Sequence, residues 1–263
     1  MPARTTSIPR VLHQIWLGKG EMPLNQRRWR RRFAEMNPHW EMRLWTDDNL
    51  PPILNRNAWD ACGNVGGTPG CVMRSDILRL EILARFGGVY LDTDVKPVRP
   101  LDEMCPPEVV AWAACEQLDI VTNAAMGFPS NHPAMWHAVA MVEESFFERR
   151  YVGDQAGPGL IARVVTQYDD VTLYPPAYFH PTVGESKSNP DAKQFLLAAH
   201  LFAGTWVHDN RRRYRELWSK NLTSTLQTPS GDPGRLASAG IVGTLAQPIS
   251  SSSGCRLMVR TAM

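Results

Sequence analysis

The sequence contains no apolar run long enough to cross a membrane. The nearest, 109–115, is far shorter than the ~18–20 residues that a span requires, and the stretch 1–9 lacks the apolar core of a signal peptide. Cysteine is also scarce: the five cysteines are odd in number and show no metal-ligand spacing. This pattern favours a reduced chain over a disulfide framework. These absences together predict a soluble, cytoplasmic protein.

The sequence also has no large excess of positive or negative charge. The formal net charge is +2, so nothing in the composition calls for a nucleic-acid partner. The length of 263 residues suffices for one domain with a full core. Toward the end, Ser, Thr, Gly and Pro dominate and periodicity fades. We therefore predict a folded domain over 1–221 and a poorly ordered tail over 222–263.

The most informative stretch is 86–95, FGGVYLDTDV. Two glycines end a helix, a short apolar run indicates a buried strand, and Asp92 and Asp94 follow it. In an extended chain, residues two apart point to one face. Carboxylates about 6–7 Å apart can share Mg²⁺ or Mn²⁺ and leave coordination positions open for a substrate phosphate. The motif predicts a metal–diphosphate site at the carboxyl end of a central strand; the alternative is a polar strand end before a turn.

A helix is predicted over 76–86, just before this motif, with Ser75 as N-cap and Gly87 as the residue after its end. Its residues are apolar over most of the circumference, so the helix is expected to be buried. Asp76 and Arg79 lie three apart on one side of it. Charges on a buried helix indicate a cavity in front of them, although the spacing also suits a surface ion pair.

Other segments alternate between strand and helix patterns and predict an α/β fold, a mixed, mostly parallel sheet with helices on both faces. Trp16, at the end of the first strand, could stack on a planar ring or belong to the core. The basic run 27–32 is either a solvated helix face or a contact for anionic lipid or a phosphorylated acceptor. A loop is expected over 55–70 and an irregular edge over 96–101. The strands are 8–18, 40–45, 109–115 and 171–174, and the helices 23–36, 134–147 and 157–167.

Four motifs, in this order, resemble glycosyltransferase family 32, the group with a DXD sugar-binding region. They are IPRVLHQIW at 8–16, WEMRLW at 40–45, SDILR at 75–79 and FGGVYLDTD at 86–94. This family is related to fungal α-1,6-mannosyltransferases, bacterial capsule and lipopolysaccharide enzymes and, distantly, clostridial glucosylating toxins. The resemblance extends to about residue 206. It implies a single-domain GT-A fold, a UDP- or GDP-linked sugar donor, Mn²⁺ or Mg²⁺ as cofactor, and retention of the anomeric configuration.

The resemblance also implies roles for individual residues. Its catalytic group would be Asp76, Arg79, Asp92 and Asp94. Donor contacts would come from Trp16 on the base, Asp76, Arg79 and Asn123 around the sugar, and Tyr90, Asp92 and Trp206. The metal ligands would be Asp92 and Asp94, completed by His200 or Thr205.

The chemistry leaves alternatives open. The acceptor could be a surface polysaccharide, a glycolipid or a host protein, and a polysaccharide or lipid-linked acceptor is preferred, with 27–32 and 211–213 as contacts for an anionic membrane. The departing phosphate could take the acceptor's proton, whereas a double displacement would need a carboxylate such as Glu116 or Asp119. A sugar-nucleotide-binding protein without transfer, or an Asp-dependent phosphatase, would also use two acids after a strand.

Overall fold

The computed structural model describes residues 7–117, 120–149, 152–180 and 192–201, which all belong to one compact unit. Several predicted features lie outside the described residues. These are the tail over 222–263, Asp119, Thr205, Trp206 and the basic run 211–213.

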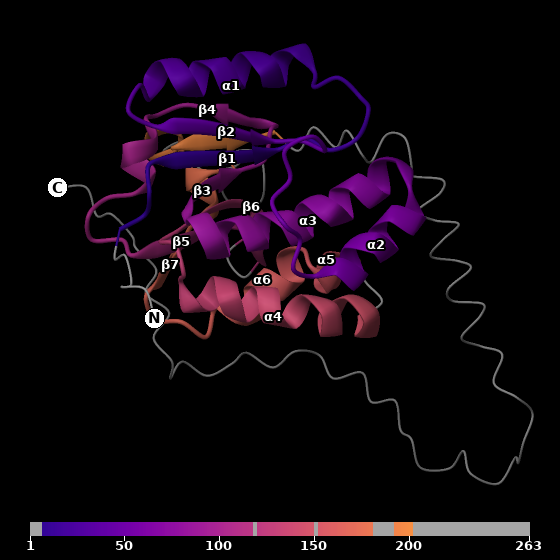
Figure 1. Ribbon diagram of the computed structural model, residues 1–263. Helices are drawn as coiled ribbons and strands as arrows, with labels where there is room; N and C mark the ends of the chain where they lie inside the picture. Colours follow the sequence, from indigo (N-terminus) through magenta and orange to yellow (C-terminus); the bar gives the residue numbers. More distant parts are fainter. Residues whose placement is uncertain (1–6, 118–119, 150–151, 181–191, 202–263) are drawn as a thin grey trace, which may run out of the picture. The chain divides into compact units, whose positions relative to one another are not determined.

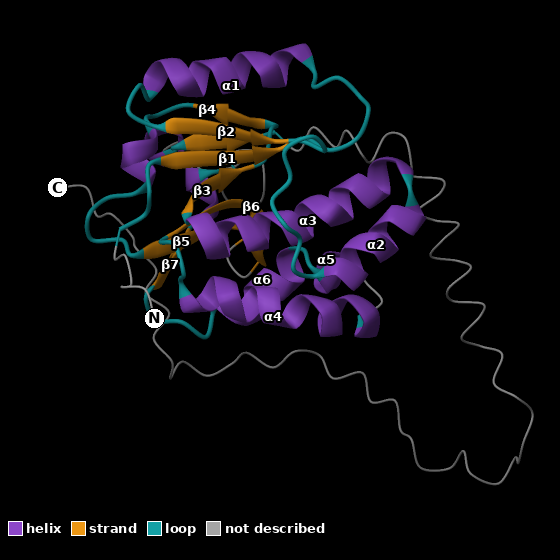
Figure 2. Cartoon of the chain, in the orientation of Figure 1, coloured by secondary structure: helices purple, strands orange, loops and turns teal. Residues whose placement is uncertain are grey.

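A six-stranded sheet forms the centre (Figure 2). Its order is β2 (Glu41–Trp45), β1 (Val11–Ile15), β3 (Gly88–Leu91), β6 (Ile120–Phe128), β5 (Ala111–Gln117) and β7 (Val171–Tyr174). Strand β6 is antiparallel to both of its neighbours, and the other pairs are parallel. The predicted mixed, mostly parallel sheet is therefore confirmed.

Both faces of the sheet are covered (Figure 1). One face packs against α2 (Arg56–Val65), α3 (Gly67–Phe86), α4 (Pro133–Glu148) and α6 (Pro158–Val165), with the short α5 (Val152–Gln155) nearby. The other face carries α1 (Leu24–Met36), a ribbon of β4 (Val95–Pro97) and β8 (Ala198–His200), η1 (Leu101–Met104), η2 (Pro176–Tyr178) and α8 (Ala192–Phe195). Two apolar clusters, one on each face, form the core.

The loop predicted over 55–70 is wrong. This stretch contains α2 and the beginning of α3, which starts at Gly67. Ser75 therefore lies inside α3 and is not its N-cap. Gly70 in this stretch allows α3 to pack closely against α2, because a Cβ at this position would lie only 2.5 Å from the carbonyl oxygen of Cys62 in α2. A glycine-rich segment was taken for a loop where it allows two helices to touch.

The irregular edge predicted over 96–101 is also partly wrong. Residues Val95–Pro97 form β4, which pairs antiparallel with β8. Beyond the ribbon, the Arg99 amide donates to the Leu197 carbonyl at 2.9 Å, and the Arg99 side chain donates to the Leu196 carbonyl at 3.1 Å. The partner strand comes about a hundred residues later, so no local pattern could reveal it. At its other end this ribbon carries Asp94 and His200.

A buried histidine ties together the strands that lead to the site. His13 in β1 accepts a hydrogen bond from the indole of Trp45 at 3.1 Å and donates its Nε2 proton to the Gly87 carbonyl at 2.9 Å. Burial lowers the pKa of His13 to about 4, so the ring is neutral. Gly88 has a φ of 96°, and a Cβ there would lie 2.6 Å from the Val11 carbonyl oxygen. Glycine at 88 thus lets β3 start close beside β1.

Candidate functional site

The two acids of the DTD motif lie in a turn directly after β3. The Val95 amide donates to the Asp92 carbonyl at 3.1 Å, so the backbone is not extended here as the spacing argument assumed. The turn nevertheless brings both carboxylates together. Asp92, Asp94 and His200 each offer a ligand atom, and these atoms lie within 4.8 Å of one another. The expected convergence of the acids is present, but a turn and not strand periodicity produces it.

His200 reaches this cluster from the last residue of β8. Its Nε2 atom lies 3.3 Å from Asp94 Oδ1, and the side chain is almost fully buried. Burial opposes protonation, but the hydrogen bond to Asp94 and the charges of Asp92, Asp94 and Glu116 outweigh it and raise the pKa of His200. Two carboxylates and one imidazole suit Mn²⁺ and fit Mg²⁺ less well, because Mg²⁺ takes oxygen ligands. The donor set therefore fits the implied cofactor.

Arg79 of α3 forms the centre of a buried ion-pair network beside the acids. Its guanidinium lies 3.1 Å from Asp76 Oδ1 and 3.1 Å from Asp92 Oδ1, and the Arg79 and Asp76 side chains are only 6% and 11% exposed. It also donates to the Asn123 carbonyl at 2.8 Å. Asp76 and Arg79 are therefore not a surface ion pair. The charges on this apolar helix point inward, toward Asp92, and the cavity expected in front of them stays a prediction.

The network holds its charges in fixed positions. Burial raises the pKa of Asp76, and Arg79 and Asn123 oppose that rise. Burial acts against the charge of Arg79 too, but Asp92 and its neighbours more than compensate and hold the pKa of Arg79 above its usual value. Three carboxyl groups, those of Asp76, Asp92 and Asp94, thus gather around one guanidinium and one imidazole, which leaves an excess of negative charge when all three are ionised. A divalent cation would offset this excess.

Tyr90 and Asn123 complete the network. The Tyr90 hydroxyl donates to Asp92 Oδ1 at 2.7 Å, and the Arg79 guanidinium lies 4.6 Å from the centre of the Tyr90 ring. Burial raises the pKa of Tyr90 well above its usual value, so it remains a phenol that can donate this hydrogen bond. The Asn123 amide donates to Asp76 Oδ1 at 2.9 Å. Tyr90 thus helps to orient Asp92, and Asn123 helps to orient Asp76, whereas their contact with a donor stays a prediction.

Trp16 follows β1 and is partly exposed, so it does not belong to the core. Its indole donates to the Gly20 carbonyl at 2.7 Å. Because β1 and β3 are adjacent and parallel, Trp16 and the acids leave the sheet at the same edge. The predicted contact of Trp16 with a donor base remains a prediction.

Two residues beside the site escaped the sequence analysis. A Cβ on Gly157, just before α6, would lie 3.2 Å from Asp76 Oδ2. His180 is fully buried, and its Nε2 lies 3.2 Å from Nδ1 of His200. No local sequence pattern marks either residue as part of a site, since a glycine before a helix and a lone histidine are both common. Only the tertiary fold brings them to the acids.

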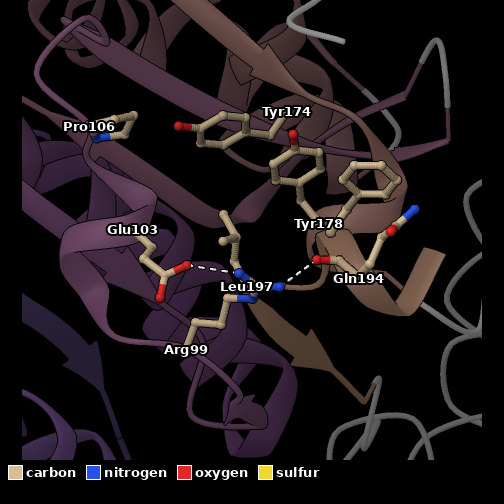
Figure 3. A pocket seen from close by; sticks show the side chains of 8 residues that line it. Arg99, Glu103, Pro106, Tyr174, Tyr178, Gln194 and Leu197 are labelled. Carbon is tan, nitrogen blue, oxygen red and sulfur yellow. Dashed lines mark hydrogen bonds and ion pairs between the residues drawn. The ribbon is translucent and has the colours of Figure 1, made fainter. Parts of the chain in front are cut away.

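A separate cavity lies at the end of the β4–β8 ribbon away from the acids (Figure 3). Tyr174, Tyr178, Leu197 and the ion pair of Arg99 with Glu103 line it. Arg99 also donates to the Gln194 carbonyl, so its guanidinium is committed to structural contacts. This cavity contains none of the predicted site residues.

Comparison with known proteins agrees with this geometry. The model of the family "glycosyltransferase sugar-binding region containing DXD motif" matches residues 23–111. This stretch of the chain is therefore similar to the DXD region of glycosyltransferases. This match, which includes Asp76, Arg79, Tyr90, Asp92 and Asp94, confirms the predicted resemblance.

Several curated proteins that this chain resembles are named mannosyltransferases. Inositol phosphoceramide mannosyltransferase 3 of Schizosaccharomyces pombe is 28% identical over 136 residues, 52% of this chain and 37% of the relative. Inositol phosphoceramide mannosyltransferase 1 of the same organism is 25% identical over 221 residues, 74% of this chain and 67% of the relative. The chain thus spans little more than a third of the length of one relative and two thirds of the other.

The fold has a counterpart among solved structures. The PaToxG glycosyltransferase superposes with a TM-score of 0.53 at 17% identity, over 61% of this chain and 70% of that chain. The expected GT-A fold is confirmed. Among the described residues, no helix has the length and apolar character needed to cross a membrane.

Proposed function

We propose that this chain is a retaining, metal-assisted glycosyltransferase. It would move a hexose from a nucleoside diphosphate sugar to a hydroxyl of an acceptor. The observation that supports this most strongly is the convergence of Asp92, Asp94 and His200 ligand atoms within 4.8 Å, beside the buried Asp76–Arg79 pair. A DXD region without such a cluster would support sugar binding only.

In this proposal Asp92, Asp94 and His200 hold Mn²⁺ or Mg²⁺. When bound, the cation supplies Lewis-acid stabilisation of the charge that develops on the leaving diphosphate. Arg79 and Asp76 present hydrogen-bonding groups to the donor sugar from a network that is already fixed by Asn123. Such prior positioning lowers the barrier because little reorganisation remains for the reaction step.

Retention of configuration needs a proton acceptor on the face from which the donor phosphate departs. We propose that the departing phosphate oxygen itself takes the proton of the acceptor hydroxyl. Glu116 contributes to the charge around His200, and its carboxylate is the described candidate for a double displacement. A covalent glycosyl adduct on Glu116, detected by mass spectrometry of the intact chain, would replace the single-face proposal with this second one.

The names of the relatives support a choice of donor and acceptor to test. Because the two relatives above are named mannosyltransferases of inositol phosphoceramide, we propose GDP-mannose as the first donor to test, with UDP-glucose, UDP-galactose and UDP-N-acetylglucosamine as alternatives. A glycolipid or surface polysaccharide is the proposed acceptor. The exposed arginines of α1, Arg27, Arg28, Arg31 and Arg32, are the proposed contact with an anionic membrane at its cytoplasmic face. Arg30 is not part of that surface, since its guanidinium binds Gln14 and the Met42 carbonyl inside the fold.

The deciding experiment is donor hydrolysis and transfer by the purified full chain, with each sugar nucleotide, in Mn²⁺, in Mg²⁺ and in chelator. We expect turnover of one donor that is lost in chelator. Asp94→Asn should keep the fold and lose at least about 100-fold in kcat, because it removes a charged ligand.

The matched control is Asp60→Asn, which alters an exposed carboxylate paired with Arg56 on the surface of α2 and should keep full activity. Full turnover in chelator would overturn the metal-assisted form of the proposal. Tight donor binding with neither transfer nor hydrolysis would favour a sugar-nucleotide-binding protein.

A further inference from the structure

A second buried histidine stands behind the candidate metal ligand. His180 Nδ1 lies 2.9 Å from the Cys115 carbonyl oxygen, and His180 Nε2 lies 3.2 Å from His200 Nδ1. On its far side, His200 Nε2 faces Asp94. A continuous chain of contacts thus runs from the backbone of β5 through two imidazoles to the acids.

The proton positions in this chain follow from its first contact. A carbonyl oxygen can only accept, so His180 must carry a proton on Nδ1. The ring is fully buried between that carbonyl oxygen and a second imidazole, and such a setting disfavours a second proton, which would place a charge in the interior. His180 Nε2 is therefore an acceptor, and the proton between the two rings belongs to Nδ1 of His200. This leaves Nε2 of His200 as the atom presented to the acids.

The segment that carries His180 is firmly attached to the ribbon and to the sheet. Its neighbours accept two backbone hydrogen bonds. The Leu197 amide, just before β8, donates to the Tyr178 carbonyl at 2.9 Å, and the His200 amide in β8 donates to the Phe179 carbonyl at 2.8 Å. Phe179 is fully buried and stacks on Trp112 of β5, with ring centroids 5.2 Å apart. The two imidazoles are therefore held in register by backbone pairing as well as by their own contact.

We infer that His180 is a positioning residue that holds His200 in its Nδ1-protonated form and directs His200 Nε2 toward a divalent cation shared with Asp92 and Asp94. The inference rests on the metal site of the proposed function. A histidine ligand binds metal through the nitrogen that lacks a proton, and the partner of the other nitrogen decides which one that is. Without His180, His200 could carry its proton on Nε2 and would then lose its ability to ligate.

Two substitutions separate this role from packing. His180→Gln keeps an amide donor for the Cys115 carbonyl and an oxygen acceptor within reach of His200. His180→Asn keeps the donor but is too short to reach His200. We expect Mn²⁺ binding to the full chain, followed by electron paramagnetic resonance of free Mn²⁺, to weaken about 10–100-fold in the Asn variant and to stay near the original value in the Gln variant.

A second measurement uses the unaltered chain without metal. Nitrogen NMR of ¹⁵N-histidine-labelled protein above pH 9, with the His200 signals assigned by their loss in His200→Gln, should show a proton on Nδ1 and none on Nε2. His132→Asn is the control: it changes another buried histidine, at the start of α4, and should alter neither readout.

The outcomes are distinguishable. Equal Mn²⁺ affinity of the Asn variant and the original chain, or a proton on His200 Nε2, would overturn the role of His180. Equal weakening in the Asn and Gln variants would mean that His180 only fills space. If the unaltered chain bound no Mn²⁺, the metal site of the proposed function would fail first, and the role of His180 with it.

Discussion

Acidification should loosen the fold through His13, the buried histidine that joins β1, β2 and the end of α3. Its pKa is lowered from 6.5 to about 4 in the folded chain because it is buried. Between these two values the unfolded chain binds a proton that the folded chain does not. The free energy of unfolding must therefore fall as the pH drops from 6.5 toward 4 and recover above 6.5.

The size of this effect follows from the shift. Each pKa unit corresponds to about 1.4 kcal/mol, so the full shift of His13 is worth about 3 kcal/mol, of which about 2 kcal/mol is lost by pH 5. His180 has its pKa lowered to about 4 as well and should add a loss in the same direction. Losses of this size are a large part of the ~5–15 kcal/mol that stabilises a typical domain.

Urea unfolding followed by tryptophan fluorescence at pH 7.5, 6.5, 5.5 and 5.0 tests this reasoning. His13→Gln keeps a donor for the Gly87 carbonyl but cannot take up the proton. Near pH 5.5 its stability should depend on pH less steeply than that of the original chain, by about one proton or ~1.4 kcal/mol per pH unit. His39→Gln, which removes an exposed histidine, is the matched control. An unchanged slope in His13→Gln would refute the argument.

Two further substitutions test the surroundings of the site and the placement of α2. Gly157→Ala places a Cβ 3.2 Å from Asp76 Oδ2, so kcat/KM for the donor should fall about tenfold with little change in the urea midpoint. The control Gly20→Ala, where a Cβ meets nothing within 4 Å, should match the original chain. Equal kcat/KM for the two variants would contradict a role of Gly157 in the placement of Asp76. Glu81→Ala removes a fully buried carboxylate that accepts from the Leu54 and Asn55 amides and pairs with Arg85, which should cost about 3–5 kcal/mol of unfolding free energy. Glu103→Ala, on an exposed pair, should cost under about 1 kcal/mol in the same assay, and similar losses in both would show that Glu81 does not hold the start of α2.

Sequence patterns over a few residues were enough to predict the parts of the fold that depend on neighbouring residues. Gly87, with a φ of 62°, ends α3 as predicted, and the apolar run after it forms a buried strand. The apolar circumference of α3 correctly indicated burial of Asp76 and Arg79. These features depend on neighbours within a few residues, and such neighbours are visible in the sequence.

The rest depends on contacts between distant segments. Gly70 was read as a loop residue because its reason, the carbonyl of Cys62 on another helix, does not appear in the pattern. The pairing of β4 with β8 was missed for the same cause. The acids were expected to converge through strand geometry, yet the turn at Asp92 and the return of His200 on β8 produce the cluster.

The β4–β8 pairing bears on how the protein is made. The DXD acids leave the ribosome about a hundred residues before His200, and closing so long a loop carries an entropic cost that only the finished ribbon offsets. A nascent chain that has emerged only as far as β6 therefore contains Asp92 and Asp94 but not yet His200. The cluster of Asp92, Asp94 and His200 can therefore form only late in synthesis, after β8 has paired with β4.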